Sequence, residues 1–248
     1  GSAKPRPAIG PVQVKTGGSV ALFVDENEVA LTFEAPQILE QIDREEFQGL
    51  YLKAKNSLAK LGGIDGHGPS LDFNGLPRSE RIAYSQRQLI GILKIVAGWR
   101  QLISLTLDGF TENKQVFELI DGLPQLRALT LKRANFSAKD LTSCQFLNKL
   151  TSFSIQEPFD SFVDPLLVRL SQCGELTGIE LDSVDFLPAS LSQLKRCPKL
   201  TTLDVGRCHP SEQAIKSIAK CKNLIDLDIS GNRTVNDHTI KYLTSLKR

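Results

Sequence analysis

Apolar residues recur through the last two thirds of the chain with a period of about 24 residues. In each of six copies, two apolar residues stand three apart and a third follows two residues later; all of these positions are apolar. The central residue of each copy is Leu105, Leu129, Phe153, Ile179, Leu203 or Leu227, which gives steps of 24, 24, 26, 24 and 24. The alternation of the last two apolar positions predicts a short strand with one buried face. A period of this length predicts a stack of similar units.

Downstream of each predicted strand, the apolar spacing changes to that of a helix. One helical face is apolar in three clear cases: Val116, Leu119 and Ile120; Ala214, Ile215 and Ile218; and Ile240, Leu243 and Leu246. Such spacing is typical of a helix that packs one side against a core. Each copy is therefore predicted to return through a helix.

The pattern weakens upstream of residue 99. Phe47, Leu50 and Leu52 repeat it once, and Leu71 and Phe73 give a truncated copy. Between this copy and the first regular one, the apolar spacing predicts a longer helix over about Ser79 to Ala97. Farther upstream, apolar runs at 20–24 and 29–33 flank a polar turn and predict a hairpin, with a short helix following near 37–46.

The two most regular copies run from Cys197 to Cys208 and from Cys221 to Asn232. With their L-x-x-L-x-L pattern, residues 99 to 248 resemble leucine-rich repeat proteins of the cysteine-containing variety. The resemblance implies a short curved arc with parallel strands on its concave face and helices on its convex face. It also implies an Asn or Cys after each strand that satisfies backbone groups of the bend. Cys208 and Asn232 fit this position, whereas the first four copies have Phe110, Ala134, Pro158 and Val184 there.

We therefore expect an α/β leucine-rich repeat solenoid that forms one continuous domain. Residues 1–19 are predicted to be a flexible lead-in, 20–98 an N-terminal cap with irregular repeats, and 99–248 the six regular repeats. A cap is expected because an end repeat would otherwise expose apolar edges and open strand hydrogen bonds.

Composition narrows the classes of partner. The 248 residues include 30 basic and 28 acidic ones, so the net charge of +2 gives no reason to expect nucleic acid or an anionic membrane as a partner. No apolar run is long enough for a membrane helix, and residues 1–19 lack a signal-peptide core. Gly1-Ser2 is typical of a cleaved expression tag, so the missing signal peptide says little about the compartment.

Three of the five cysteines, Cys173, Cys197 and Cys221, are 24 residues apart, and Cys144 and Cys208 complete the set. Equivalent positions stack in a repeat protein, so these three are predicted to be small buried groups in a column. A disulfide or a metal site is the alternative, although no C-x-x-C pair or Cys/His cluster accompanies them. Reduced thiols give a weak indication of a cytoplasmic setting.

The residue between the last two apolar positions of each copy is expected to face the concave sheet. These residues are Thr106, Thr130, Ser154, Glu180, Asp204 and Asp228, so the face changes from neutral to acidic halfway along, and Asp182 and Asp226 extend the acidic part. Like charges on strands about 4.8 Å apart repel, and a basic ligand would relieve the repulsion. These eight residues are the predicted partner-binding set. Alternatively, the carboxylates are merely solvated, or are neutralised by Arg207 or by Lys132 and Arg133.

No catalytic, cofactor or metal constellation is recognisable. His67 lies in a glycine-rich loop, His209 and His238 lack a second ligand at metal spacing, and no phosphate-binding G-x-x-x-x-G-K motif occurs. Basic residues of the return helices, such as Lys195 and Lys216, are expected to solvate the convex side.

The leading hypothesis is a non-catalytic module that binds a protein partner on its concave face, and replacement of Glu180, Asp204 and Asp228 by serine is expected to weaken that binding. A second hypothesis is the substrate-recognition arm of a larger enzyme, such as a ubiquitin ligase or a bacterial effector, with its catalytic part outside this chain. A third is a self-associating structural protein. The sequence does not specify the oligomeric state or the compartment.

Overall fold

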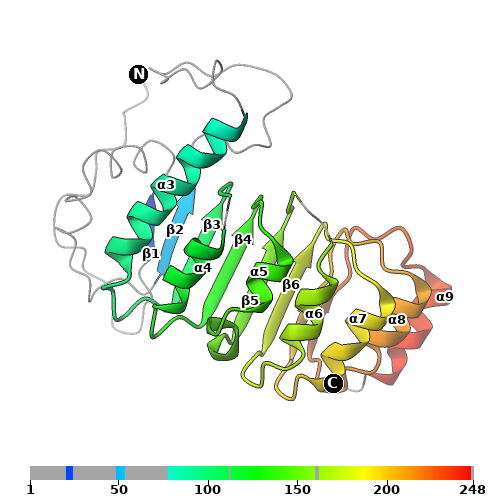
Figure 1. Ribbon diagram of the computed structural model, residues 1–248. Coiled ribbons are helices and arrows are strands. Elements are labelled where there is room, and N and C mark those ends of the chain that lie inside the picture. The colour runs from blue at the N-terminus through cyan, green and yellow to red at the C-terminus, as the bar shows by residue number, and fades with distance from the viewer. Residues whose placement is uncertain (1–20, 25–48, 54–77, 112, 160–161, 247–248) are drawn as a thin grey trace, which may run out of the picture.

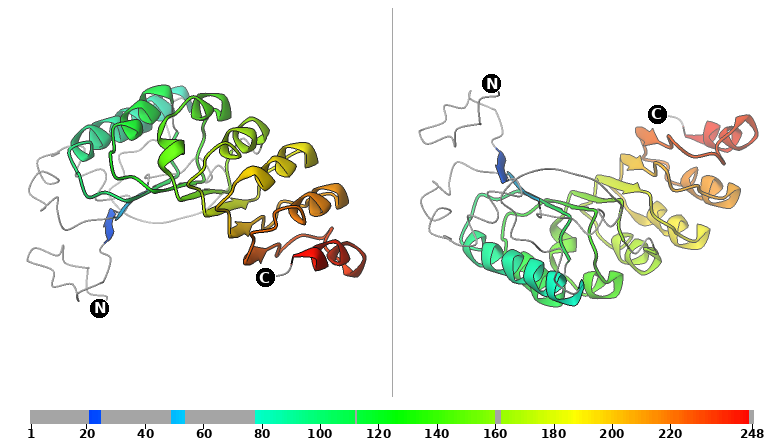
Figure 2. Two further views of the ribbon diagram at one scale, coloured as in Figure 1. Left: turned by 90° about the horizontal axis from the view of Figure 1, so that it is seen from below. Right: turned by 90° about the horizontal axis from the view of Figure 1, so that it is seen from above.

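The computed structural model describes residues 21–24, 49–53, 78–111, 113–159 and 162–246. Its strands form one parallel sheet in which the spatial order is the order along the chain. The sheet lines the inner side of a curved arc, and helices cover the outer side (Figures 1 and 2). The strands are β1 (Ala21–Val24), β2 (Gly49–Lys53), β3 (Ser104–Asp108), β4 (Ala128–Lys132), β5 (Ser152–Gln156), β6 (Gly178–Asp182), β7 (Thr202–Asp204) and β8 (Asp226–Asp228).

An α-helix follows each strand from β3 onward, and the longest of the described helices lies between β2 and β3. The α-helices are α3 (Arg78–Val96), α4 (Lys114–Asp121), α5 (Ala138–Thr142), α6 (Asp164–Leu170), α7 (Pro188–Leu191), α8 (Glu212–Ile218) and α9 (Asp237–Ile240). Short 3₁₀ helices complete three repeats: η3 (Phe146–Lys149), η4 (Ser192–Arg196) and η5 (Lys241–Ser245). Side-chain caps fix several helix starts, because an oxygen of Asn113, Ser137, Ser211 or Asn236 accepts a first-turn N–H.

The register confirms the predicted ladder. Leu105 lies opposite Leu129, which lies opposite Phe153, and the row continues through Ile179 to Leu203 and Leu227. The residue immediately before β5, β6 and β7 shows a second regularity. The hydroxyls of Thr151, Thr177 and Thr201 each donate to a carbonyl of the preceding repeat. These bonds hold neighbouring coils in the same register.

In the N-terminal region, β2 brings Leu50 and Leu52 opposite Leu105 and Leu107 of β3, as the repeated ladder pattern predicted. The truncated copy at Leu71 and Phe73 lies outside the described residues. β1, which covers the first of the two predicted hairpin strands, pairs in parallel with β2. The expected second hairpin strand, the short helix near 37–46, the lead-in at 1–19 and His67 lie outside the described residues. The predicted longer helix is confirmed as α3.

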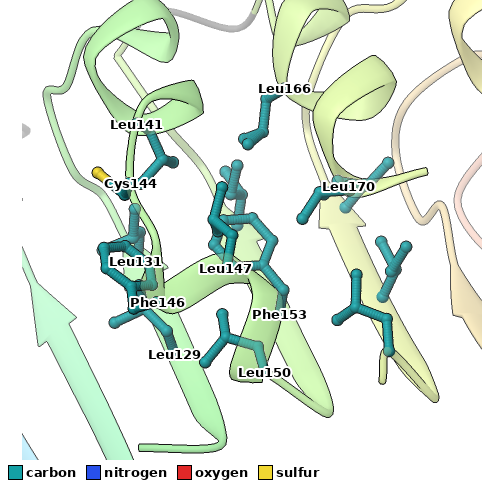
Figure 3. Packing of buried hydrophobic residues seen from close by; sticks show 14 of the residues in the cluster. Leu129, Leu131, Leu141, Cys144, Phe146, Leu147, Leu150, Phe153, Leu166 and Leu170 are labelled. Carbon is teal, nitrogen blue, oxygen red and sulfur yellow. The ribbon is translucent and has the colours of Figure 1, made fainter. Parts of the chain in front are cut away.

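The space between sheet and helices is filled by the ladder and by the apolar sides of the helices. Figure 3 shows Leu129, Leu131 and Phe153 of the sheet facing side chains of η3, α5 and α6. Trp99 is fully buried, as expected for core packing at the start of the regular repeats. All five cysteines are buried with free thiols, and burial raises the pKa of Cys197 to about 12. The predicted column of small buried groups is therefore observed.

A bend follows each strand from β3 onward, and the residue at one repeated position of the bend has a positive φ. These residues are Gly109, Arg133, Glu157, Ser183, Arg207 and Gly231, with φ between 45° and 80°. The bend after β7 has a second residue with positive φ, His209, at 47°. Residues other than glycine have a mildly strained backbone in this conformation. At Gly231 the neighbourhood is also crowded, because a Cβ atom there would lie 2.8 Å from Cγ of Arg207.

Replacing Gly231 with alanine is expected to lower the free energy of unfolding by about 1–2 kcal/mol, because the new Cβ adds strain at positive φ. The measurement is urea-induced unfolding followed by circular dichroism. Gly178→Ala is the matched control: a Cβ there meets only Ser152 Oγ at 3.8 Å and Thr202 Cβ at 4.0 Å. We expect that substitution to raise the stability by about 0.5–1 kcal/mol. Equal effects of the two substitutions would contradict the explanation.

Candidate functional site

The outward-facing residues of the ladder form one continuous row across the concave face. Strand register places Thr106 opposite Thr130, then Ser154, Glu180, Asp204 and Asp228 in turn. Asp182 and Asp226 point to the same side from flanking rows, because each lies two residues from a member of the row. We call Glu180, Asp204 and Asp228 the acidic column.

Two members of the acidic column also shape the backbone. Oδ1 of Asp204 accepts a hydrogen bond from the N–H of Gly206 at 2.7 Å, and Oδ1 of Asp228 accepts one from the N–H of Ser230 at 2.7 Å. These bonds stabilise the bend after each strand, a role that the sequence analysis did not foresee. The hydrogen bonds from Ser230 lower the pKa of Asp228.

Asp204 behaves differently because it stands in the middle of the column. Its partial burial raises its pKa, and the neighbouring carboxylates Asp228, Glu180 and Asp182 add to the rise, against the hydrogen bond from Gly206. The carboxylate of Asp204 is therefore repelled by the neighbouring carboxylates of the same face.

Glu180 is oriented by residues of the preceding strand. Ser154 Oγ donates to Oε2 of Glu180 at 2.8 Å, and Gln156 Nε2 donates to Oε1 at 2.7 Å. Ser154 is only 4% exposed, so it positions Glu180 and presents almost no surface of its own. Thr106 and Thr130 are partly exposed on the neutral half of the row.

Arginines form ion pairs with several other carboxylates near this face. Arg207 forms ion pairs with Asp182 and with Glu157. Arg133 pairs with Asp108 at 2.5 Å, and the hydroxyl of Tyr51 donates to the same carboxylate oxygen. Neither arginine forms an ion pair with the acidic column, although the negative charge of Asp204 contributes, after Asp182 and Glu157, to the raised pKa of Arg207. Across the described ranges, Glu180, Asp204, Asp226 and Asp228 take part in no ion pair.

Asp108 was missed by the sequence analysis. It is 1% exposed and is enclosed by side chains from β2 and from the bend after β4. The repeat pattern could have indicated Asp108, because it occupies the same position in its copy as Asp182 does in a later copy. Burial raises the pKa of Tyr51 to about 12, and its hydrogen bond to Asp108 contributes.

The acidic column borders a hollow on the concave face with a volume of about 300 Å³. Gly178 has no side chain to fill it, and the surrounding polar groups come from β5 to β8. Its lining residues are Ser152, Gly178, Ile179, Glu180, Thr202, Leu203, Asp204, Asp226 and Asp228.

Two further properties concern metals and membranes. In the described part of the chain, no three His, Cys, Asp or Glu side chains are grouped so that they could hold a metal ion. None of the helices described here combines the length and the apolar character that crossing a bilayer requires.

Comparisons with known proteins give matches at the level of structure alone. No family model matches the sequence, and no curated protein matches it. Among solved structures, the internalin InlF from Listeria monocytogenes str. 4b F2365 matches with a TM-score of 0.39 and 13% identity, covering 64% of this chain and 61% of that one. A TLR13–ssRNA13 complex matches with a TM-score of 0.48 and 17% identity, covering 84% of this chain and 30% of that one. The chain thus spans less than two thirds of either protein.

The assignment of the fold rests on the geometry of the chain itself. Each unit consists of a strand with two inward apolar residues, a left-handed bend and a helical return, and successive units pair in register. Asn232 and Cys208 serve the bend as the resemblance implied: Nδ2 of Asn232 donates to the carbonyls of Val205 and Ile229, and Sγ of Cys208 donates to those of Leu181 and Gly206. With these units stacked side by side along a curved parallel sheet, the chain has the leucine-rich repeat fold.

Proposed function

We propose that the chain is a non-catalytic binding module, and that a protein partner with a basic surface docks on the concave face of β6, β7 and β8. The proposal rests on one observation, which is the contrast between paired and unpaired carboxylates on the same face. Asp108 and Asp182 each have an arginine partner within the chain, whereas the acidic column and Asp226 have none among the described residues. A basic partner would supply the missing positive charge.

The energetics favour such a partner. Two carboxylates about 5 Å apart repel by about 1 kcal/mol in water and by about 3 kcal/mol at an effective dielectric constant of 20. Burial is the main cause of the raised pKa of Asp204, and this repulsion adds to it. A lysine or arginine placed between the carboxylates replaces repulsion by attraction, and a preformed sheet loses little conformational entropy on docking.

The shape of the face supports the same proposal. The hollow above Gly178 is open to the concave side and is bordered by Glu180, Asp204 and Asp228. A basic side chain of the partner can enter it and contact carboxylates from three strands. Phosphate groups of a nucleic acid would meet the same carboxylates with like charge, so a protein partner is favoured over a polyanion.

The test is a triple variant in which the charges are removed but the hydrogen bonds are kept. Replacement by serine was the variant suggested from the sequence. Asp204 and Asp228, however, accept hydrogen bonds from N–H groups of the bends, and the shorter serine side chain is less suited to accept them. Glu180→Gln, Asp204→Asn and Asp228→Asn retain a side-chain oxygen at each place. We expect this variant to bind oligolysine about tenfold more weakly than the unmodified chain at low salt, equivalent to about 1.4 kcal/mol. Fluorescence anisotropy of labelled oligolysine measures the change.

The control removes the same number of charges from other parts of the surface. Glu118 and Glu175 form exposed ion pairs with Lys114 and Lys199, and Asp237 is exposed at the start of α9. A variant carrying Glu118→Gln, Glu175→Gln and Asp237→Asn is expected to bind within about twofold of the unmodified chain, since these carboxylates lie away from the acidic column. Equal losses in the two variants would show that net charge alone attracts oligolysine, and would overturn the assignment to the concave face.

A further inference from the structure

Two neighbouring helices begin without the polar residue that caps the other helices of the regular repeats. The N-cap residues of α4, α5, α8 and α9 are asparagine or serine, and each side chain accepts a first-turn N–H. The N-cap residues of α6 and α7 are Val163 and Leu187, whose side chains make no such bond. Val163 is fully buried, so packing accounts for it, but Leu187 is 56% exposed. A serine or asparagine there would stabilise α7 more, which indicates that Leu187 has a role other than stability.

The loop before α6 also departs from the repeat. The α-helix begins nine residues after the central ladder residue in four repeats and ten residues after it in the last. In the third repeat α6 begins eleven residues after Phe153, so this loop accounts for the longer step of 26 residues. It contains Phe159 and Phe162, which are 42% and 50% exposed, whereas Phe136 in the corresponding loop of the preceding repeat is 7% exposed. Insertions in repeat proteins often lie on the binding face.

Hydrogen bonds hold this loop beside the loop that carries Leu187. Phe162 and Asp185 form a parallel bridge. The N–H of Leu187 donates to Oδ1 of Asp164, a buried carboxylate at the start of α6, at 2.9 Å. Leu187 has an extended backbone and follows Asp185 by two residues, so it points to the side on which Phe162 lies. We call Phe159, Phe162 and Leu187 the rim patch, because they lie in the loops between the sheet and the helices.

The rim patch gathers exposed apolar side chains. Seven large apolar side chains of the described residues are exposed, and three of them lie in these two loops. Single exposed apolar residues are ordinary on protein surfaces, whereas a group of them marks an interaction site. The other four lie in neither loop: Ile103, Val168, Ile225 and Ile240.

Charge indicates which partner covers the rim patch. Residues 157–168 and 182–194 contain no lysine, arginine or histidine but five acidic residues. One arginine of the following repeat, Arg207, pairs with two of these carboxylates. Acidic surroundings favour apolar residues flanked by lysine or arginine, and they disfavour a second copy of the chain, which would bring the same carboxylates. The five acidic residues are Glu157, Asp160, Asp164, Asp182 and Asp185.

The rim patch is continuous with the acidic column through β6. Glu180 in β6 and Leu187 in the loop after β6 are seven residues apart, and seven residues span at most about 25 Å. Phe159 follows β5, whose Ser154 orients Glu180. One extended segment of about seven or eight residues can therefore contact both places.

We propose that the rim patch binds large apolar side chains of the same basic partner, next to the lysine or arginine that the acidic column receives. The bound segment combines a basic cluster with an apolar cluster, separated by a few residues. This inference rests on the proposed function and adds an apolar contact to it. A partner with basic residues alone lacks this contact, so the rim patch discriminates among basic partners.

The first test compares two labelled peptides by fluorescence anisotropy, with the full chain as the receptor. One is acetyl-Lys-Lys-Lys-Gly-Ser-Gly-Ser-Leu-Phe-Leu-amide, the apolar peptide; in the other, the serine peptide, serine replaces the three apolar residues. We expect the apolar peptide to bind about tenfold more tightly, because the rim patch buries its leucine and phenylalanine side chains. Equal affinities of the two peptides would overturn the inference.

Replacing Leu187 with serine separates binding from folding. Serine restores a capping side chain at the start of α7, so we expect the midpoint of urea unfolding to stay the same or to rise. Binding of the apolar peptide is nevertheless expected to weaken about fivefold, while the serine peptide and oligolysine change by less than about twofold. Phe162→Ser is expected to give the same binding pattern. The control is Val168→Ser, since Val168 is 42% exposed on α6 but lies outside both loops, and it is expected to leave the binding of both peptides unchanged.

The outcomes distinguish this inference from the proposed function. If Leu187→Ser and Phe162→Ser leave binding of the apolar peptide unchanged while Glu180→Gln, Asp204→Asn and Asp228→Asn weaken it, the rim patch is overturned and the concave site stands. If the two serine variants weaken it while the amide variant changes neither peptide nor oligolysine binding, the concave site fails and the rim patch alone remains supported. Self-association of the chain, seen by light scattering and abolished by Leu187→Ser, would show that a second copy covers the patch and would overturn the inference.

Discussion

Replacing Phe153 with alanine is expected to lower the free energy of unfolding by about 3–5 kcal/mol, because a fully buried aromatic side chain is lost and a cavity remains. Phe153 is 0% exposed and lies in the middle of the apolar ladder, with Leu147 and Leu150 beside it (Figure 3). Neighbouring coils hold both sides of the cavity apart through the threonine hydroxyl bonds, so collapse of the site is restricted. The loss should therefore fall in the upper part of the usual range.

The measurement is unfolding in urea, followed by circular dichroism and by the fluorescence of Trp99, the single tryptophan and a fully buried one. Phe153→Leu is the matched control, because Leu129 occupies the same ladder position in the preceding coil. We expect the free energy of unfolding of the leucine variant to fall by less than about 1.5 kcal/mol. An alanine variant within 1 kcal/mol of the unmodified chain would show that this part of the core repacks freely, contrary to the tight stacking described above.

Replacing Asn232 with alanine is expected to lower the free energy of unfolding by about 2–4 kcal/mol, because three hydrogen bonds of a buried side chain are lost at once. Oδ1 of Asn232 accepts from the N–H of His209 at 2.7 Å, and Nδ2 donates to Val205 and Ile229 at 2.8 Å each. Asn232 is 8% exposed, so water replaces these partners poorly. Backbone groups of two successive bends would be left without a partner.

Asn232→Cys is the informative control for this position. Cys208, one repeat earlier, donates its thiol to two carbonyls at 3.1 and 3.2 Å. A thiol is a weaker donor and cannot replace the acceptor of the His209 N–H, so the cysteine variant is expected to lie between alanine and asparagine in stability. Hydrogen exchange at His209 should speed up in both variants. If cysteine is no better than alanine, the role assigned to Cys208 is wrong.

The sequence predicted the parts of the structure that follow from periodic burial. The ladder from Leu105 to Leu227, the helix α3 and the buried cysteine column all repeat at fixed spacing, and a spacing can be read without knowledge of the fold. The direct pairing of β2 with β3 could not be predicted in the same way, because the pairing of two strands depends on which segments the intervening chain brings together.

The candidate site was predictable only as a row of residues. Strand register follows from the repeat, so the position of Glu180, Asp204 and Asp228 in one column could be foreseen. Their hydrogen bonds could not, since Asp204 and Asp228 accept from backbone N–H groups whose direction depends on the bend. The positive φ of Ser183 and Arg207 was equally hidden, because neither side chain favours that conformation.

The order of the strands also determines how the protein would respond to tension. Among the described strands, each is hydrogen-bonded only to the strands next to it in the sequence. A pull on the C-terminal end would therefore detach β8 first and then unwind one coil after another. A coil of 24 residues releases about 80 Å of extended chain, at about 3.3–3.6 Å per residue. The leucine spacing thus sets the length of each extension step.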